Sequence, residues 1–221
     1  MKICIFGDSI GKGVILPDTG HYKMVKPDLE KLTGRKDLEL KNYAVFGSTI
    51  TRTLQVLERH AGELTDGETV LLEVGGNDCD FDWQAISDKP EEKHECKTPF
   101  SVFEDAYRRV INLIRGKNAT PVILTMPPMI PKRYFDTIAI GKNRENILRW
   151  LGGTVETMYR WQEMYNLRLV MLARSLNVRL IDIRSVFLAD HHCENLISRD
   201  GIHPNEKGYN LIYQTVKDSM S

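Results

Sequence analysis

Three short and nearly continuous apolar runs constrain the fold of this chain more than any other feature. They are residues 3–6, 70–72 and 122–124, with the sequences Ile-Cys-Ile-Phe, Val-Leu-Leu and Val-Ile-Leu. A strand with one face in water alternates apolar and polar side chains, whereas an unbroken run is typical of a strand covered on both faces. The runs therefore predict buried strands of the kind found in a parallel sheet.

Helical patterns separate the predicted strands along the chain. The segment 38–41 alternates in polarity, which favours a strand near the edge of the sheet. A helix start is indicated by Thr98 as N-cap and Pro99 at the first helical position. The predicted strands are Lys2 to Phe6, Leu38 to Val45, Thr69 to Val74, Pro121 to Met126 and Val178 to Ile183. The predicted helices are Ile50 to Leu64, Thr98 to Ile114, Thr154 to Leu176 and a last one that begins near Pro204.

The alternation of strands and helices predicts the fold class. It is typical of a three-layer α/β/α sandwich, here with a central five-stranded parallel sheet of the flavodoxin-like kind. With 221 residues, of which 42% are hydrophobic, the chain can bury a substantial core. Because no repeat, low-complexity tract or linker interrupts the pattern, we expect a single domain over residues 1–221.

Three residues that suit chemistry follow directly after predicted strands. Ser9, Gly47 and Asn77 each come just past the end of one of the first three strands. In a parallel α/β sheet, ligands bind beyond the carboxyl ends of the strands. We therefore expect these three residues to gather at one edge of the sheet.

A serine, a histidine and an aspartate that suit acyl transfer stand near opposite ends of the chain. Ser9 lies in the sequence Gly-Asp-Ser-Ile, and His203 ends the sequence Asp-Gly-Ile-His that begins at Asp200. A serine hydroxyl is a poor nucleophile unless a base removes its proton, and the base works best when a carboxylate fixes its tautomer. Each residue alone also fits a turn or a helix cap. The interpretation therefore requires a fold that brings the chain ends together.

Two other strand ends carry groups that can donate hydrogen bonds. Gly47 has a backbone N–H that can face a ligand, and residues 75–78 read Gly-Gly-Asn-Asp. Two glycines allow close approach of the backbone, and Asn77 adds a side-chain amide. Acyl transfer needs such donors around the oxyanion of its tetrahedral intermediate. The alternative is a loop that is simply rich in turn-forming residues.

These short motifs together resemble the SGNH hydrolases, also called GDSL-type lipases and esterases. The first block is residues 7–10, in which Ile10 replaces the commoner leucine, and Gly47 matches the glycine of the second block. Residues 75–78 resemble the third block, and residues 200–203 fit the Asp-x-x-His pattern of the last. All four blocks occur in order and span nearly the whole chain.

The resemblance implies a catalytic triad and the SGNH-hydrolase fold. Ser9 is then the nucleophile, and His203 is the general base that later acts as general acid toward the leaving alkoxide. Asp200 orients and supports the imidazole. Since Asp200 and His203 are three residues apart on one turn, they can pair without help from a distant strand.

The resemblance also implies an oxyanion hole. Its donors are the backbone N–H groups of Ser9 and Gly47 and the side-chain amide of Asn77. We interpret Asp8 and Asp78, which adjoin these residues, as carboxylates that brace the loops rather than as chemical groups.

The implied activity is that of a serine esterase that works through an acyl-enzyme. We expect short, acetyl-type esters of a sugar or another small soluble molecule as substrates. A lysophospholipase or acyl-thioesterase acting on longer acyl chains is the alternative within the family. A non-catalytic binding module on the same fold is the alternative outside it.

Charge and targeting patterns bear on partners and location. The chain has 30 basic and 30 acidic residues, so its formal charge is zero and gives no reason to expect nucleic acid or an anionic membrane. No leader precedes the serine motif, and no run of about 18 apolar residues occurs. We therefore expect a cytoplasmic protein without membrane insertion, and the pattern leaves a homo-oligomer open.

Neither the cysteines nor the histidines form a recognisable metal-binding pattern. His191 and His192 adjoin a cysteine, but paired ligands at short spacing are missing. We expect no metal and no cofactor, and residues 7–13 lack a phosphate-loop pattern. We also expect free thiols rather than disulfides. The cysteines are Cys4, Cys79, Cys96 and Cys193.

Three segments are expected to bear on the shape of the substrate site. Residues 80–97 are predicted to form an irregular loop near the pocket, with Phe81 and Trp83 as wall or packing residues. Residues 126–131 are too proline-rich for a helix and are expected over the same sheet edge. Ile138 to Gly153 fits a lid, a dimer contact or plain surface.

Overall fold

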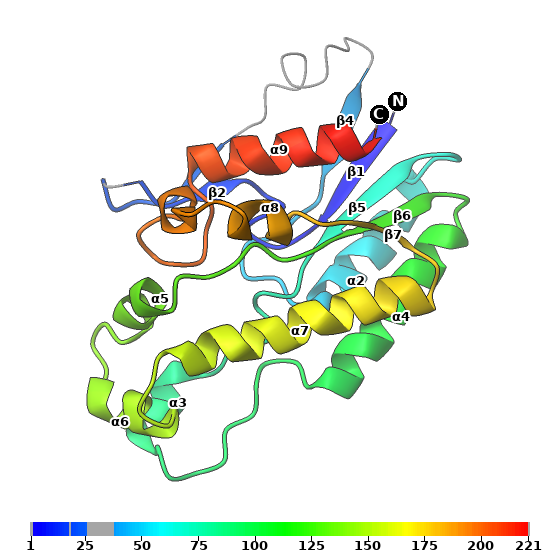
Figure 1. The fold of residues 1–221 in the computed structure, drawn as a ribbon. Helices are drawn as coiled ribbons and strands as arrows, with labels where there is room; N and C mark the ends of the chain where they lie inside the picture. The colour runs from blue at the N-terminus through cyan, green and yellow to red at the C-terminus, as the bar shows by residue number, and fades with distance from the viewer. Residues whose placement is uncertain (1, 18, 26–37, 221) are drawn as a thin grey trace.

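The computed structural model describes residues 2–17, 19–25 and 38–220 and is built around a five-stranded sheet (Figure 1). All its strands run parallel, in the order β4-β1-β5-β6-β7. The predicted five-stranded parallel sheet is therefore confirmed, with the alternating segment at its edge as β4. The strands are β1 (Lys2–Gly7), β4 (Glu39–Asn42), β5 (Thr69–Glu73), β6 (Thr120–Leu124) and β7 (Arg179–Ile181).

Helices cover both faces of this sheet, which confirms the predicted three-layer α/β/α sandwich (Figure 1). One face carries α2, α4 and α7, and the other carries α8 and α9. The helices are α2 (Ile50–His60), α4 (Phe100–Arg115), α7 (Glu156–Ser175), α8 (Arg184–Leu188) and α9 (Glu206–Met220).

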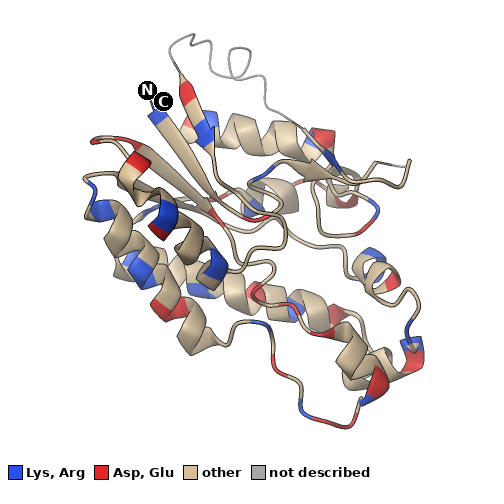
Figure 2. Cartoon of the chain, turned by 180° about the vertical axis from the view of Figure 1, so that it is seen from behind, with Lys and Arg blue, Asp and Glu red and all other residues tan. Residues whose placement is uncertain are grey.

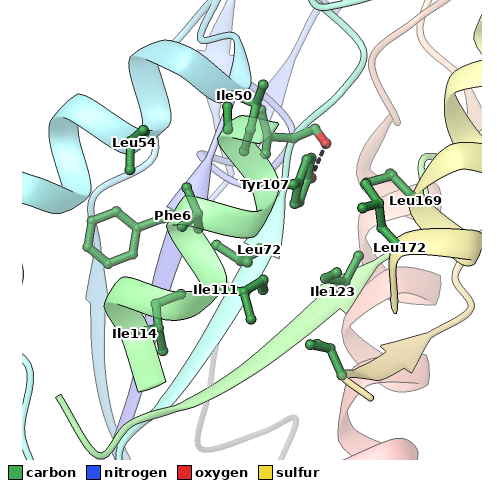
Figure 3. Close-up of a cluster of buried hydrophobic side chains, with 14 of the residues drawn as sticks. Phe6, Ile50, Leu54, Leu72, Tyr107, Ile111, Ile114, Ile123, Leu169 and Leu172 are labelled. Atoms are coloured by element: carbon green, nitrogen blue, oxygen red, sulfur yellow. Dashed lines mark hydrogen bonds between the residues drawn. The ribbon is translucent and has the colours of Figure 1, made fainter. Parts of the chain in front are cut away.

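The apolar runs are buried on both sides because successive residues of a strand point to opposite faces. Phe6 of β1 packs in the core beneath α2, α4 and α7, whereas Ile3 of the same strand packs in the core beneath α9. Leu72 and Leu71 of β5 divide between the two cores in the same way. Figure 3 shows the first of these cores, in which Phe6 and Leu72 face α4.

Tyr107 of α4 ties this core to the end of β5. Its hydroxyl donates a hydrogen bond of 2.6 Å to the carbonyl oxygen of Val74, the residue that follows the strand (Figure 3). Tyr107 is fully buried, and burial raises its pKa well above the ordinary value. The ring therefore stays neutral and holds the start of the loop that carries Asn77.

Three further helices lie beyond the carboxyl ends of the strands, on the side away from the chain ends (Figure 1). Their buried side chains form a separate core rich in aromatic residues. The prediction of an irregular loop over residues 80–97 is wrong in part, because a helix begins after Asp82, whose carboxylate accepts hydrogen bonds from the N–H groups of Gln84 and Ala85. The helices are α3 (Trp83–Asp88), α5 (Pro131–Ile138) and α6 (Arg144–Trp150).

The strand predicted from Leu38 to Val45 is shorter in the structure and ends at Asn42. The Asn42 side chain accepts a hydrogen bond from the N–H of Ala44 at 2.9 Å and donates one to the carbonyl of Gly11 at 2.8 Å. The chain nevertheless stays alongside β1 as far as Val45, whose N–H donates to the carbonyl of Gly7 at 3.0 Å. The turn that contains Gly47 comes only after Val45.

The helix predicted from Thr98 begins at Phe100, and Pro99 takes the N-cap position instead of the first helical one. The Thr98 hydroxyl makes no cap, because it bonds with the buried carboxyl group of Asp78. The other predicted strands and helices differ from the structure at their ends.

Basic and acidic residues are interspersed along the outer helices and loops (Figure 2). Within the described residues, no helix combines the length and the apolar character needed to span a membrane. All four cysteines are free thiols, as the sequence predicts.

Candidate active site

Ser9 lies in a tight turn that begins where β1 ends. The carbonyl of Asp8 accepts a hydrogen bond from the N–H of Lys12 at 3.0 Å, and the carbonyl of Ser9 accepts one from the N–H of Val14 at 2.9 Å. The turn faces the carboxyl edge of the sheet, and only 7% of Ser9 is exposed. The hydroxyl of Ser9 therefore lies at the carboxyl edge of the sheet, where the sequence predicts it.

A single line of hydrogen bonds joins the three residues of the predicted triad. The Ser9 hydroxyl lies 2.8 Å from Nε2 of His203, and Nδ1 of His203 lies 2.6 Å from Oδ2 of Asp200. These contacts join residues 194 positions apart in the chain. The structure thus brings Ser9, His203 and Asp200 together as the sequence predicts.

The Asp200 carboxylate is fixed by its own turn as well as by the imidazole. Its Oδ1 atom accepts hydrogen bonds of 3.1 Å from the N–H groups of both Ile202 and His203. Burial alone would raise the pKa of Asp200, but the hydrogen bonds from His203 and the nearby backbone hold it below the ordinary value. Asp200 is therefore ionised at neutral pH and can support a protonated imidazole.

Gly201 allows this turn to pack closely on α5. It has a positive φ of 81°, and a Cβ atom there would lie 2.4 Å from the backbone nitrogen of Tyr134. The carbonyl of Gly201 also accepts a hydrogen bond of 2.7 Å from the N–H of Ile130. Glycine is thus the residue that fits between Asp200 and His203.

Three donors surround the space next to the Ser9 hydroxyl. Ser9, Gly47 and Asn77 line the same cavity, and Gly47 has a positive φ of 70° in the turn after β4. In the described part of the chain, the backbone N–H groups of Ser9 and Gly47 have no hydrogen-bond acceptor. One N–H of the Asn77 amide donates to Oδ2 of Asp8 at 3.2 Å, which leaves the second N–H for a ligand. This set can bind an oxyanion.

The two carboxyl groups next to these donors brace loops, as the sequence predicts. Both oxygens of Asp78 accept hydrogen bonds from the N–H of Ile50, the first residue of α2, at 3.0 and 3.1 Å. Burial raises the pKa of Asp78 to about 7. Asp8 accepts from the N–H of Ile10 at 2.9 Å and from Asn77. Asp78 thus links the Asn77 loop to α2, and Asp8 links it to the Ser9 turn.

A cavity of about 250 Å³ extends from Ser9 away from the sheet. At its mouth, the half-exposed rings of Tyr22 and Phe46 lie 5.4 and 6.0 Å from the ring of His203. Its deeper walls are mainly apolar and come from the elements beyond the strand ends. The wall residues are Phe81, Trp83, Met129, Tyr134, Leu151, Met158 and Trp161.

The polar groups in the deep part of the cavity already have protein partners. Oδ1 of Asp80 accepts hydrogen bonds from the Tyr134 hydroxyl at 2.6 Å and from Nε1 of Trp83 at 2.7 Å. The amide of Gln162 donates to the carbonyl of Pro127 and accepts from the guanidinium of Arg184. The deep part of the cavity therefore favours hydrocarbon groups over hydroxyl groups.

Sequence reasoning found part of this cavity and missed the rest. Phe81 and Trp83, expected as wall or packing residues, line the cavity and also pack in the aromatic core behind it. Within the segment 138–153, Leu151 also lines the cavity, and α6 packs against α3. Tyr22 was missed because a small antiparallel pair, β2 (Val14–Ile15) and β3 (Lys23–Met24), places it. Such two-residue strands leave no periodic signal.

The buried Glu73 was also missed, although its signal is visible in the sequence. It ends β5 directly after an apolar run and is only 3% exposed. An acidic residue inside a strand that is covered on both faces is unusual.

Among the described residues, no group of three or more histidine, cysteine, aspartate or glutamate side chains is placed to hold a metal ion.

The chain is similar to known proteins in sequence and in fold. The sequence profile of the GDSL-like lipase/acylhydrolase family matches residues 5–211. No curated protein sequence matches significantly.

Solved structures share the fold over nearly the full chain. A lipase/acylhydrolase from Enterococcus faecalis is 18% identical with a TM-score of 0.66, and the match covers 99% of this chain and 94% of that one. A member of the lipolytic G-D-S-L family from Veillonella parvula is 17% identical with a TM-score of 0.65, covering 99% and 97%. An acetyl xylan esterase is 23% identical with a TM-score of 0.60, covering 100% and 98%.

Proposed function

The chain belongs to the GDSL-like lipase/acylhydrolase family and is an ester hydrolase, and from this premise we propose that Ser9 is its nucleophile, His203 its general base and Asp200 the carboxylate that orients the base. The observation that carries this proposal is the unbroken line of contacts at 2.8 and 2.6 Å from the Ser9 hydroxyl to the Asp200 carboxylate. Contacts of this length let one proton pass between Ser9 and His203 as the reaction proceeds.

The proposed reaction has two halves. Ser9 Oγ attacks the carbonyl carbon of the ester while Nε2 of His203 takes the hydroxyl proton. The resulting oxyanion accepts hydrogen bonds from the N–H groups of Ser9 and Gly47 and from the Asn77 amide. The intermediate collapses to an acyl-enzyme, and His203 returns the proton to the departing alkoxide. Water then attacks the acyl-enzyme by the same route, which releases the carboxylic acid and restores Ser9.

The size of the cavity supports a short acyl group. A dry apolar cavity of about 150 Å³ holds one benzene molecule. The cavity next to Ser9 measures about 250 Å³ in all, from its mouth to the wall at Leu151 and Trp161. This space suits acetyl-type and other compact acyl groups better than the long chain of a lysophospholipid or fatty acyl thioester.

The aromatic mouth of the cavity supports an alcohol part that has an apolar face, such as a sugar ring. Tyr22 and Phe46 are 49% and 51% exposed, and the centroids of their rings lie 5.5 Å apart beside His203. Exposed aromatic rings that border a site offer apolar surface to a partner. One solved structure with this fold is named an acetyl xylan esterase. We therefore propose a short acyl ester of a sugar or of another small soluble alcohol as the substrate.

The nucleophile is tested by Ser9→Ala. We expect the variant to lose ester hydrolysis and covalent labelling by a fluorophosphonate, while its circular dichroism spectrum stays that of the wild type. Ser101→Ala, an exposed serine of α4, serves as the matched control and should retain both. Failure of the folded wild type to label would favour a non-catalytic binding module.

The substrate class is tested by nitrophenyl esters of increasing acyl length, assayed beside acetylated sugars. We expect kcat/KM to be highest for short acyl groups and the acetylated sugars to be hydrolysed. A preference for long acyl chains would overturn the sugar-ester proposal and leave the catalytic assignment intact.

A further inference from the structure

Two acidic side chains, those of Asp8 and Glu73, lie together directly behind the Ser9 turn. Asp8 is 1% exposed and Glu73 is 3% exposed. The register of β1 and β5 sets Gly7 opposite Glu73, and the N–H of Asp8 donates to the carbonyl of Glu73 at 3.0 Å. The two carboxyl groups are in hydrogen-bond contact with each other.

Two buried carboxyl groups in contact cannot both be ionised unless a cation compensates them. Among residues 2–17, 19–25 and 38–220, no lysine or arginine forms an ion pair with Asp8 or Glu73. The contact between two acids therefore requires a proton between them, as in other buried carboxyl pairs.

Hydrogen bonds decide which residue carries this proton. Asp8 accepts two N–H donors, from Ile10 at 2.9 Å and from Asn77 at 3.2 Å. Glu73 accepts one, from Gly11 at 2.9 Å. More donors favour the charged form, so Asp8 is the carboxylate and Glu73 the acid. Burial raises the pKa of both groups, and Asp8 raises the pKa of Glu73 further.

We propose that Glu73 is a positioning residue, whose protonated carboxyl group donates to the Asp8 carboxylate and so holds Asp8 as the acceptor for the Asn77 amide. This inference rests on the proposed function, because it assigns Asn77 to the oxyanion hole. With one amide N–H held by Asp8, the other is directed toward the substrate. Glu73 touches no reacting atom and acts through Asp8 and Asn77.

Loss of the Glu73 proton would place a second negative charge in this contact. Repulsion would then disturb Asp8 and with it the direction of the Asn77 amide. Other titratable groups face the pair from elements packed around it. They are His203 before α9, Asp78 after β5, Tyr107 on α4 and Tyr209 on α9. Among these, the imidazolium formed during the reaction favours the charge on Asp8.

The test compares Glu73→Gln with Glu73→Ala, using nitrophenyl acetate as the substrate. Glutamine keeps a neutral donor for Asp8 and an acceptor for Gly11, so kcat should stay within about threefold of the wild type at neutral pH. Alanine removes the donor, so kcat should fall about tenfold or more while KM changes little, because the lost contact acts on the oxyanion. Wild-type kcat should also decline at alkaline pH, and the glutamine variant should lack this decline.

Glu68→Gln is the matched control. Glu68 is a glutamate that is 1% exposed at the opposite end of β5, where it accepts a hydrogen bond from the N–H of Thr65. Its variant should keep the wild-type pH profile. Equal losses of kcat in Glu73→Gln and Glu73→Ala, or no loss in either, would overturn the positioning role.

Thermal unfolding tests whether Glu73 is protonated in the fold, and this test does not depend on ester hydrolysis. In the unfolded chain Glu73 ionises above its ordinary pKa of 4.5, whereas in the fold it keeps its proton. Wild-type stability should therefore fall as the pH rises above this value, and the Tm of Glu73→Gln relative to wild type should rise. A constant difference in Tm between acidic and neutral pH would refute the buried proton. Labelling of Ser9 by a fluorophosphonate in the variants separates this outcome from failure of the proposed triad.

Discussion

Asp200 and Asp8 flank Ser9 at equal depth, yet their surroundings drive their pKa values in opposite directions. Each is 1% exposed. The pKa of Asp200 lies below its ordinary value, because His203 and two backbone N–H groups outweigh burial. The pKa of Asp8 is raised, because burial outweighs the hydrogen bonds from Ile10, Glu73 and Asn77 that lower it. Burial raises the free energy of each charge, and the hydrogen-bond partners decide how far that cost is offset.

The largest effect is expected from Asp200→Asn, which removes the charge on one side of this comparison. An amide at this position no longer supports the imidazolium and favours the wrong tautomer of His203. We expect kcat to fall about 10⁴-fold with little change in KM. Steady-state kinetics on a short acyl ester measure this loss, with the exposed Asp190→Asn as control. A variant that keeps a tenth of the wild-type kcat would contradict the assignment of Asp200.

Asn77→Ala tests the Asp8 part of the comparison, because Asp8 accepts a hydrogen bond from the Asn77 amide. Removal of one oxyanion donor typically lowers kcat by about 10²–10³. The exposed Asn112→Ala on α4 is the control and should show wild-type kinetics. A loss confined to KM would show that the amide binds substrate without stabilising the oxyanion.

Asp78→Asn tests whether burial without a charged partner keeps an acid neutral. The pKa of Asp78 is about 7 in the fold against an ordinary value of 3.8. Wild-type stability should therefore fall as the pH rises from about 4 to 7, and the asparagine variant should gain stability relative to it by on the order of 2–4 kcal/mol. Chemical denaturation at several pH values measures this difference. A difference that is independent of pH would mean that Asp78 is ionised in the fold.

The smallest effect is expected from Leu151→Trp, which changes the volume of the cavity and leaves the buried charges alone. Leu151 is 3% exposed and lines the cavity wall. The larger ring should lower kcat/KM for hexanoyl esters about tenfold and leave acetyl esters within about threefold. Leu167→Trp, at a residue of α7 that is 55% exposed, is the control. An equal loss for both ester lengths would assign this wall to folding rather than to acyl selection.

The carboxyl edge of the sheet could be predicted from sequence because its signals are local. Ser9, Gly47 and Asn77 each follow a recognisable strand, and the parallel order of those strands places them together. Asp200 and His203 could be paired because three residues of one turn separate them.

The parts that escaped prediction depend on contacts between distant residues. The pairing of Asp8 with Glu73 follows from the register of β1 against β5, which an isolated apolar run does not specify. The helix α3 is only six residues long, so packing of Trp83 against Tyr134 and Trp150 stabilises it more than its own propensity does.

The distance along the chain between Ser9 and His203 has a consequence for folding. Their contact closes a loop of 194 residues, so it forms only when β1 and the segment before α9 have both docked on the same sheet. Contacts of such long range are typical of slow, late folding steps. Because the proposed activity needs this contact, the recovery of ester hydrolysis during refolding would report completion of the fold. Partly folded chains would show no ester hydrolysis.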